Sequence, residues 1–228
     1  MKNSLEQLQY VQKRIENACI AAGRRADEVS LLAVSKRHPA EKIITLNELG
    51  VLDFGENQLQ EALLKQKKLQ HLDLQWHFIG TIQSNKTGDI AANFQWVQSV
   101  DRIKVLQRLS RQRPSTSNPL NICLQVNIDM EPQKAGATTD EILQLAALAE
   151  SLDNIRLRGL MAIPKLSDDP QQQHISFRKV HHLFEELKNS GHDLDTLSMG
   201  MSADLEIAVA EGSTMVRIGT DLMGHRPT

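Results

Sequence analysis

Lys36 has the residue type and the position for amine chemistry. It ends the apolar run Leu31–Lys36, and Pro39 follows closely, a pattern typical of a buried strand that stops at the proline. A lysine that leaves the core there is partly desolvated, which lowers the pKa of its ammonium group and makes the amine a nucleophile for aldehydes. An exposed lysine that merely ends a strand is the alternative, and the local sequence does not decide between the two.

Two small-residue segments near the C-terminus have the character of phosphate-binding loops. Gly200 and Ser202 follow one strand-like run, and Gly219 and Thr220 follow the next. Small residues let backbone N–H groups approach a phosphate, and hydroxyls add donors. Ser202 has a compatible alternative as the N-cap of a helix beginning near Ala203. An amine beside a phosphate cradle predicts a phosphorylated aldehyde, and pyridoxal 5′-phosphate (PLP) is the common cofactor with both groups.

The elements that must position these residues alternate regularly along the chain. Apolar residues at helical spacing predict a helix over about residues 3–22. Eight strand-like runs follow, over residues 29–36, 51–55, 76–80, 96–100, 122–128, 157–163, 196–199 and 215–219. Helix-like segments lie between them, over about residues 40–49, 56–70, 84–93, 101–112, 139–152, 171–189 and 203–211.

Strict alternation with several continuous apolar strands predicts an α/β fold with a parallel sheet. We predict a single (β/α)8 TIM-type barrel with an extra N-terminal helix, and an open doubly wound sheet is the alternative. The predicted organisation is one PLP-binding domain over residues 1–228, with the barrel at about 29–226. In such barrels the chemistry lies at the carboxyl ends of the strands, which is where Lys36 and the small-residue segments fall.

Composition narrows the class of protein. The 228 residues carry a formal net charge of −2, so we expect neither a nucleic acid nor a membrane as partner. The basic segment Lys65–Lys68 sits on a helical pattern and is predicted to be a solvated face. Two cysteines without a cluster, Cys19 and Cys123, favour a reducing compartment and no structural metal. The charged N-terminus does not resemble a signal peptide, so we expect a cytoplasmic protein.

Taken together, the motifs at the strand ends resemble the PLP homeostasis protein family, also called the YggS-type or proline synthetase co-transcribed protein family. The resemblance runs from about residue 29 to the C-terminus and is carried by residues 33–36, 54–57, 76–80, 83–86, 159–164, 197–202 and 216–220. It implies a barrel related to the N-terminal domain of alanine racemase, with PLP held on Lys36 as an internal aldimine. It also implies a carrier or buffer that influences vitamin B6 metabolism without established turnover. Two departures affect the expected cofactor mouth: Gln58, where the family often has Tyr, and changes within residues 127–136.

The resemblance assigns further roles around the cofactor. Arg217 would face the pyridine nitrogen, and the alternative is an ion pair with a strand-end carboxylate such as Asp221. Ser202, Gly219 and Thr220 would bind the phosphate. Asn57 would contact the ring or line the mouth of the site, or else cap the helix that follows.

Four other residues are weaker candidates. His77 alternates with apolar neighbours, so we interpret it as a core histidine with satisfied hydrogen bonds rather than a catalytic one. Lys86 and Lys134 are candidates for binding free PLP or another anion, against a solvated lysine. Lys165 competes for the Schiff base, because class I aldolases resemble this barrel, but its position beyond Pro164 predicts an exposed loop lysine.

The sequence favours a carrier over an enzyme. A two-base racemase needs a second acid/base on the other face of the cofactor, and racemases of this fold supply a tyrosine from an added β-domain. The single tyrosine here is Tyr10, and the chain ends at Thr228 shortly after the last strand, so we expect no such domain. We therefore predict a monomeric PLP carrier that exchanges the cofactor with apo PLP-dependent enzymes. A PLP-dependent amino-acid racemase is the alternative, followed by an aldolase-like barrel without PLP.

Overall fold

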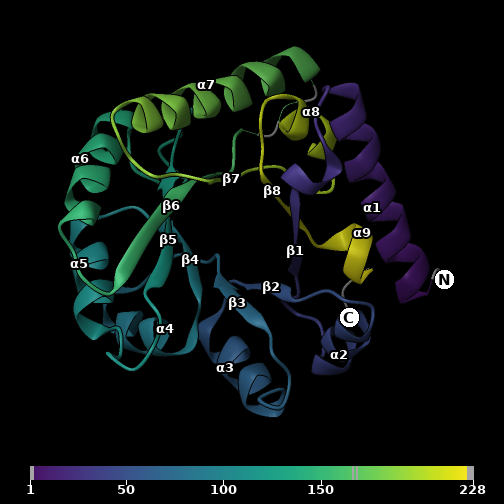
Figure 1. Cartoon of the computed structure of the whole chain (residues 1–228), viewed down its shortest axis with the longest axis horizontal. Coiled ribbons are helices and arrows are strands. Elements are labelled where there is room, and N and C mark those ends of the chain that lie inside the picture. Colours follow the sequence, from purple (N-terminus) through teal and green to yellow (C-terminus); the bar gives the residue numbers. More distant parts are fainter. Residues whose placement is uncertain (1–2, 166, 168, 225–228) are drawn as a thin grey trace.

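A closed barrel of parallel strands forms the centre of the molecule. The computed structural model describes residues 3–165, 167 and 169–224, and Figure 1 shows its strands surrounded by helices. The strands pair in sequence order, and the last pairs with the first. They are β1 (Ser30–Val34), β2 (Asp53–Glu56), β3 (Gln75–Phe78), β4 (Trp96–Val100), β5 (Leu120–Val126), β6 (Ile155–Ala162), β7 (Thr196–Ser198) and β8 (Met215–Ile218). The predicted barrel is confirmed, and the open doubly wound sheet is wrong.

The helices form the outer layer and follow the predicted order (Figure 1). They are α1 (Ser4–Ala21), α2 (Ala40–Glu48), α3 (Leu59–Lys68), α4 (Thr87–Asn93), α5 (Ile103–Gln112), α6 (Thr139–Glu150), α7 (Pro170–Asn189), α8 (Leu205–Ala210) and α9 (Thr220–Met223), with 3-10 turns η1 (Ala26–Glu28) and η2 (Ser84–Lys86). The extra N-terminal helix is confirmed, and it packs against α8 and α9. Two short helical elements, η1 and α9, were not predicted. Residues 166, 168, 225 and 226 of the predicted barrel range lie outside the described residues.

Two helices begin at capping boxes that the sequence carries. At α1, the Glu6 amide donates to Asn3 Oδ1 at 2.8 Å, and the Asn3 amide donates to the Glu6 carboxylate at 3.2 Å. At α6, Thr138 and Glu141 form the same reciprocal pair, which confirms the predicted start of that helix. Each box satisfies two amides that the helix itself leaves unpaired.

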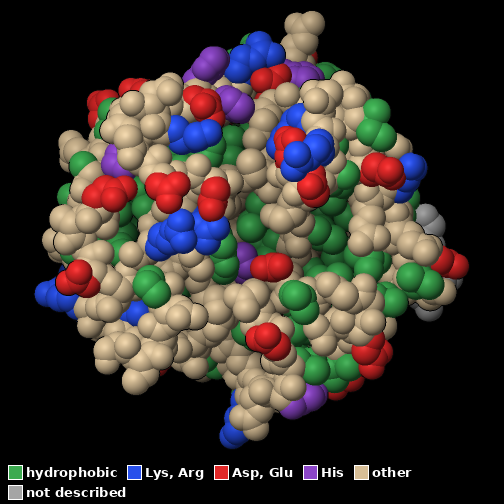
Figure 2. Space-filling view, viewed as in Figure 1, with side chains coloured by type: hydrophobic (Ala, Val, Ile, Leu, Met, Phe, Trp, Pro, Cys, Tyr) green, Lys and Arg blue, Asp and Glu red, His purple; other side chains and the backbone are tan. Residues whose placement is uncertain are grey.

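Positive and negative side chains are mixed over the face of the molecule that Figure 2 shows, and neither sign dominates it. Figure 2 shows acidic and basic side chains interspersed over one end of the molecule. Among the described residues, no helix combines the length and the apolar character needed to span a membrane. The same part of the chain contains no group of three or more His, Cys, Asp or Glu side chains placed to hold a metal ion.

Gly159 provides a test of the barrel packing. It has φ +151° in β6, where a Cβ atom would lie 1.9 Å from the Thr196 carbonyl oxygen of β7. We expect Gly159→Ala to lower the free energy of unfolding by about 3 kcal/mol, through backbone strain and overpacking.

The control is Gly88→Ala in α4, where the added methyl would meet the Gln112 side chain at 3.8 Å. Because alanine favours a helix over glycine, this variant is expected to be neutral or up to about 1 kcal/mol more stable. Urea unfolding measures both. Equal stabilities of the two variants would contradict the close approach of β6 and β7.

Candidate functional site

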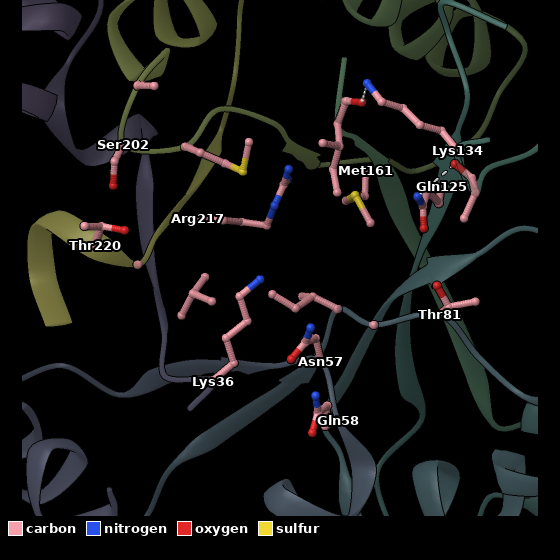
Figure 3. A pocket seen from close by; sticks show the side chains of 18 of the residues that line it. Lys36, Asn57, Gln58, Thr81, Gln125, Lys134, Met161, Ser202, Arg217 and Thr220 are labelled. Atoms are coloured by element: carbon pink, nitrogen blue, oxygen red, sulfur yellow. Dashed lines mark hydrogen bonds between the residues drawn. The ribbon is translucent and has the colours of Figure 1, made fainter. Parts of the chain in front are cut away.

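The carboxyl ends of the strands surround a cavity of about 1140 Å³, slightly larger than the upper end of the usual cofactor-site range of about 300–1000 Å³. All six predicted site residues line it: Lys36, Asn57, Ser202, Arg217, Gly219 and Thr220. Figure 3 shows Lys36 and Arg217 projecting into this space, with Ser202 and Thr220 on one side and Thr81, Gln125 and Lys134 on the other. The fold therefore brings an amine, a guanidinium group and a set of small and hydroxyl residues together.

Barrel closure places Lys36 beside the last loop. In the β1–β8 pair, Ala33 lies opposite Ile218, so both strands leave the sheet at the same level. Lys36 lies two residues after the end of β1, and Gly219 and Thr220 follow β8 directly. The Lys36 side chain is half-buried at the cavity wall. The amine and the candidate phosphate loop are thus neighbours, although nearly the whole chain separates them in sequence.

Side chains of α3 form hydrogen bonds with the backbone on both sides of Lys36. The Lys65 amine donates to the Ser35 carbonyl oxygen at 2.7 Å, and the Arg37 amide donates to Glu61 Oε1 at 2.6 Å. Arg37 has φ +61°, a left-handed conformation that costs a non-glycine residue about 1 kcal/mol or more. Contacts from α3 on each side of Lys36 therefore hold this strained turn in place.

Lys65 is the main correction to the predicted surface. It was expected on a solvated helix face, but only 6% of it is exposed. Its amine donates to Glu56 Oε1 and to Glu61 Oε1, each at 2.6 Å, and Ser35 Oγ donates to the same Glu56 oxygen at 2.6 Å. Glu56 is fully buried, and burial raises the pKa of its carboxyl group, against the opposing effect of Lys65. The Glu61–Lys65 spacing of i,i+4 suggests only a surface pair, so the buried partner could not be anticipated.

Arg217 lies inside the barrel and contacts backbone and hydroxyl oxygens. Its Nη1 donates to the Ser198 carbonyl oxygen at 2.7 Å and to Ser198 Oγ at 2.9 Å, and its Nη2 donates to the Ala162 carbonyl oxygen at 2.8 Å. Burial lowers the pKa of the guanidinium group to about 10. The alternative ion pair with Asp221 is wrong, because Asp221 binds Arg14 at 2.5 Å.

Arg14 of α1 holds the two small-residue loops together, a role that the sequence did not reveal. Besides Asp221, it donates to the Ser202 carbonyl oxygen at 2.9 Å and to the Glu206 carboxylate at 2.7 and 2.8 Å. Ser202 was considered as an N-cap, but α8 begins at Leu205 with Asp204 before it, so that alternative is wrong. No local pattern around Arg14 predicts a contact with loops at the other end of the chain.

Asn57 carries an unused acceptor at the cavity. Its Oδ1 atom is buried and has no hydrogen-bond partner among the described residues. The alternative role as a helix cap is wrong, because Gln58 holds the N-cap position of α3 and no side chain caps that helix. A buried polar atom without a partner is costly, so an acceptor that lines a cavity is suited to a ligand donor.

Of the four weaker candidate residues, Lys134 lines the cavity and the other three do not. His77 is fully buried and bonded at both ring nitrogens, which confirms a core histidine. Lys165 is exposed and, like Lys86, is absent from the cavity lining. Lys134 does line the cavity, forms an ion pair with Glu131 and donates to the Pro164 carbonyl oxygen at 3.0 Å. Gln58 also lines it, as do Gln133 and Ala135 from the altered part of residues 127–136, so both departures from the family pattern reach the cavity.

Comparison with known proteins shows which family has this sequence and fold. The sequence model of the alanine racemase N-terminal domain matches residues 10–227. The chain is 53% identical over 226 residues to the pyridoxal phosphate homeostasis protein of Pseudomonas aeruginosa, covering 99% of this chain and 97% of that protein. It is 42% identical over 229 residues to the protein of the same name from Escherichia coli K12, covering 99% and 98%.

Solved structures agree with these matches. PipY of Synechococcus elongatus PCC7942, solved with PLP bound, is 36% identical with a TM-score of 0.82, covering 92% of this chain and all of that one. An alanine racemase of Clostridium difficile, at 17% identity and a TM-score of 0.74 over 98% of this chain and 58% of that one, shares the barrel fold. The chain therefore belongs to the pyridoxal phosphate homeostasis protein family, within the larger group that shares the alanine racemase N-terminal domain.

Proposed function

We propose that this protein binds PLP in the barrel cavity through Lys36 and serves in intracellular PLP homeostasis. The observation that carries the proposal is the convergence of Lys36, Arg217 and the Ser202, Gly219 and Thr220 loops on one cavity. When bound, PLP supplies an aldehyde that condenses with an amine, a phosphate and a pyridine ring. Relatives named for PLP homeostasis and the PLP-bound PipY structure support the same cofactor.

Each group of the cofactor has a matching set of residues. Lys36 supplies the amine, and Ser202, Gly219 and Thr220 supply backbone and hydroxyl donors for the phosphate. Asn57 has a buried acceptor without a partner and supplies a contact for the ring substituents. Arg217 faces the pyridine nitrogen and, as a permanent cation, disfavours protonation of that atom. This arrangement retains the cofactor but weakens the ring as an electron sink.

The proposal is a carrier rather than an enzyme. A racemase requires a second acid/base opposite the lysine, and tyrosine fills that role in racemases of this fold. Among the described residues, no tyrosine lines the cavity, and Tyr10 lies on α1 with 47% of its surface exposed. We propose a cytoplasmic monomer in which residues 1–228 form one PLP-binding unit that supplies apo PLP-dependent enzymes.

The covalent tether is tested by Lys36→Ala. Purified protein given PLP is expected to show the visible absorbance of a lysine-linked cofactor, and Lys36→Ala is expected to lose it. Lys165→Ala is the matched control and should keep the band, because Lys165 lies outside the cavity. Borohydride reduction and peptide mass spectrometry locate the linked lysine. A reduced adduct on another lysine in the unaltered protein would contradict the assignment.

The network behind Lys36 is tested by Lys65→Met. Removing the amine leaves the buried Glu56 carboxylate without its cation, which is expected to cost about 3–5 kcal/mol of unfolding free energy. Loss of Lys65 also raises the pKa of Glu56 further above its ordinary value. A carboxyl group with a raised folded-state pKa is tolerated when protonated and destabilises as pH rises, so the cost should be greater at mildly alkaline than at mildly acidic pH.

Lys68→Met on the same helix is the control, because Lys68 is exposed. It should change stability by less than about 0.5 kcal/mol. Urea unfolding at the two pH values measures stability. Equal effects of the two substitutions would show that the Lys65–Glu56 contact does not stabilise the folded protein.

The carrier function is tested by transfer of bound cofactor. PLP-loaded protein is mixed with an apo PLP-dependent enzyme in the presence of a trap for free PLP, and recovery of that enzyme's activity is followed. A carrier is expected to reactivate the enzyme faster than released PLP can account for. Transfer limited by release, together with robust Lys36-dependent racemisation of alanine or other amino acids, would favour a racemase instead.

A further inference from the structure

A continuous chain of side-chain hydrogen bonds crosses the barrel interior and ends at Arg217. His77 Nε2 lies 2.9 Å from Asp53 Oδ1, and Gln98 Nε2 lies 2.9 Å from His77 Nδ1. Ser198 Oγ donates to Gln98 Oε1 at 2.7 Å and accepts from Arg217 Nη1 at 2.9 Å. Asp53 begins β2 at the amino end of the barrel, whereas Arg217 lines the cavity at the carboxyl end. We call Asp53, His77, Gln98 and Ser198 the interior chain.

All donors in this chain point in one direction. Arg217 donates to Ser198, Ser198 donates to Gln98, the Gln98 amide donates to His77, and His77 donates to the Asp53 carboxylate. A carboxylate accepts only, so it fixes the His77 proton on Nε2 and leaves Nδ1 as an acceptor. That acceptor sets the orientation of the Gln98 amide, which in turn directs the Ser198 hydroxyl proton away from Arg217. The Ser198 oxygen is therefore left with lone pairs for the guanidinium group.

The interior chain requires that His77 is neutral and that its ring is held in one orientation. The structure provides both conditions. His77 is fully buried, and burial lowers the pKa of its ring despite the nearby Asp53. Its ring stacks on Trp96 with centroids 5.1 Å apart and planes 8° apart. The Arg158 guanidinium group lies over the same indole, 4.6 Å from its centroid. A neutral, immobilised imidazole has one donor and one acceptor, so it transmits the direction of the chain.

The interior chain matters to Arg217 because none of the described carboxylates bonds it directly, although the charge of Asp204 acts on it from beyond ion-pair distance. Among the residues that the structure describes, no carboxylate forms an ion pair with Arg217. A buried cation without a paired charge is expensive, and hydrogen bonds aligned between a cation and an anion strengthen one another. Gln98 and Ser198 are both fully buried, so water does not compete for these contacts.

We propose that the interior chain is a positioning device: it sets the orientation of Arg217 in the cofactor cavity, and through it the surroundings of the bound PLP ring. This inference rests on the proposed function, because it assumes PLP beside Arg217. It assigns roles to Asp53 and Gln98, which lie outside the cavity lining. Loss of a link leaves Arg217 bonded to the Ser198 and Ala162 carbonyl oxygens, but the Ser198 hydroxyl contact to Nη1 is then either lost or no longer directed by the interior chain.

The test uses the full-length, PLP-loaded protein and two substitutions at opposite ends of the chain. Ser198→Ala removes the hydroxyl that contacts Arg217. Asp53→Asn alters the remote end, where the side chain is 38% exposed, and replaces an acceptor by a group that also donates. Ser213→Ala is the matched control, because Ser213 is fully buried and its hydroxyl lies within hydrogen-bond distance of the carbonyl oxygens of residues 197, 199 and 215 rather than of the interior chain.

The readouts are the positions and ratio of the absorption bands of the bound cofactor and its dissociation constant. We expect Ser198→Ala and Asp53→Asn to shift the bands and to weaken PLP binding about three- to tenfold, whereas Ser213→Ala leaves both unchanged. Unchanged bands in both chain variants would overturn the inference while leaving PLP binding intact. Absence of any cofactor band in the unaltered protein would overturn the proposed function, and the inference with it.

Discussion

The pairing of β1 with β8 is the constraint on which the site depends. It closes the barrel and sets the level at which the first and last strands leave the sheet, with Ala33 opposite Ile218. That register places Lys36 and the Gly219–Thr220 segment beside each other. Parallel strands also share one direction, so the residues that follow them gather at one end of the barrel. An amine from near the N-terminus and small-residue loops from near the C-terminus thus form one cavity.

Each functional cation at this end is supported by polar groups inside the fold. Glu56, Lys65 and Glu61 hold the turn that carries Lys36, while Arg14 ties the Ser202 and Asp221 loops together. Arg217 connects to Asp53 through the barrel core. Buried ion pairs contribute little net stability compared with apolar packing. The buried Lys65–Glu56 pair and the hydrogen bonds of Arg14 and Arg217 instead orient the turn at Lys36, the loops and the Arg217 side chain.

Under the proposed function, Lys36, Arg217 and the phosphate loops would retain the cofactor rather than use it for catalysis. In the proposed complex, Arg217 at the pyridine nitrogen would disfavour a protonated ring, and with it the strong electron withdrawal on which carbanion chemistry depends. In the proposed complex, the amine of Lys36 and the phosphate loops would hold the two ends of PLP. Among the described residues, no tyrosine lines the cavity to act as the second acid/base that racemisation requires.

Strand order, the helical layer and the residues at the strand ends could be predicted from sequence, because apolar periodicity and small-residue loops are local signals. Lys36, Asn57, Ser202, Arg217, Gly219 and Thr220 were all identified in this way or through family motifs, and the structure brings them to one cavity. Lys65, Arg14, Asp53 and Gln98 carry no such signal. Whether a lysine on an amphipathic helix is solvated or paired with a buried glutamate depends on what packs against it, and only the closed barrel decides that.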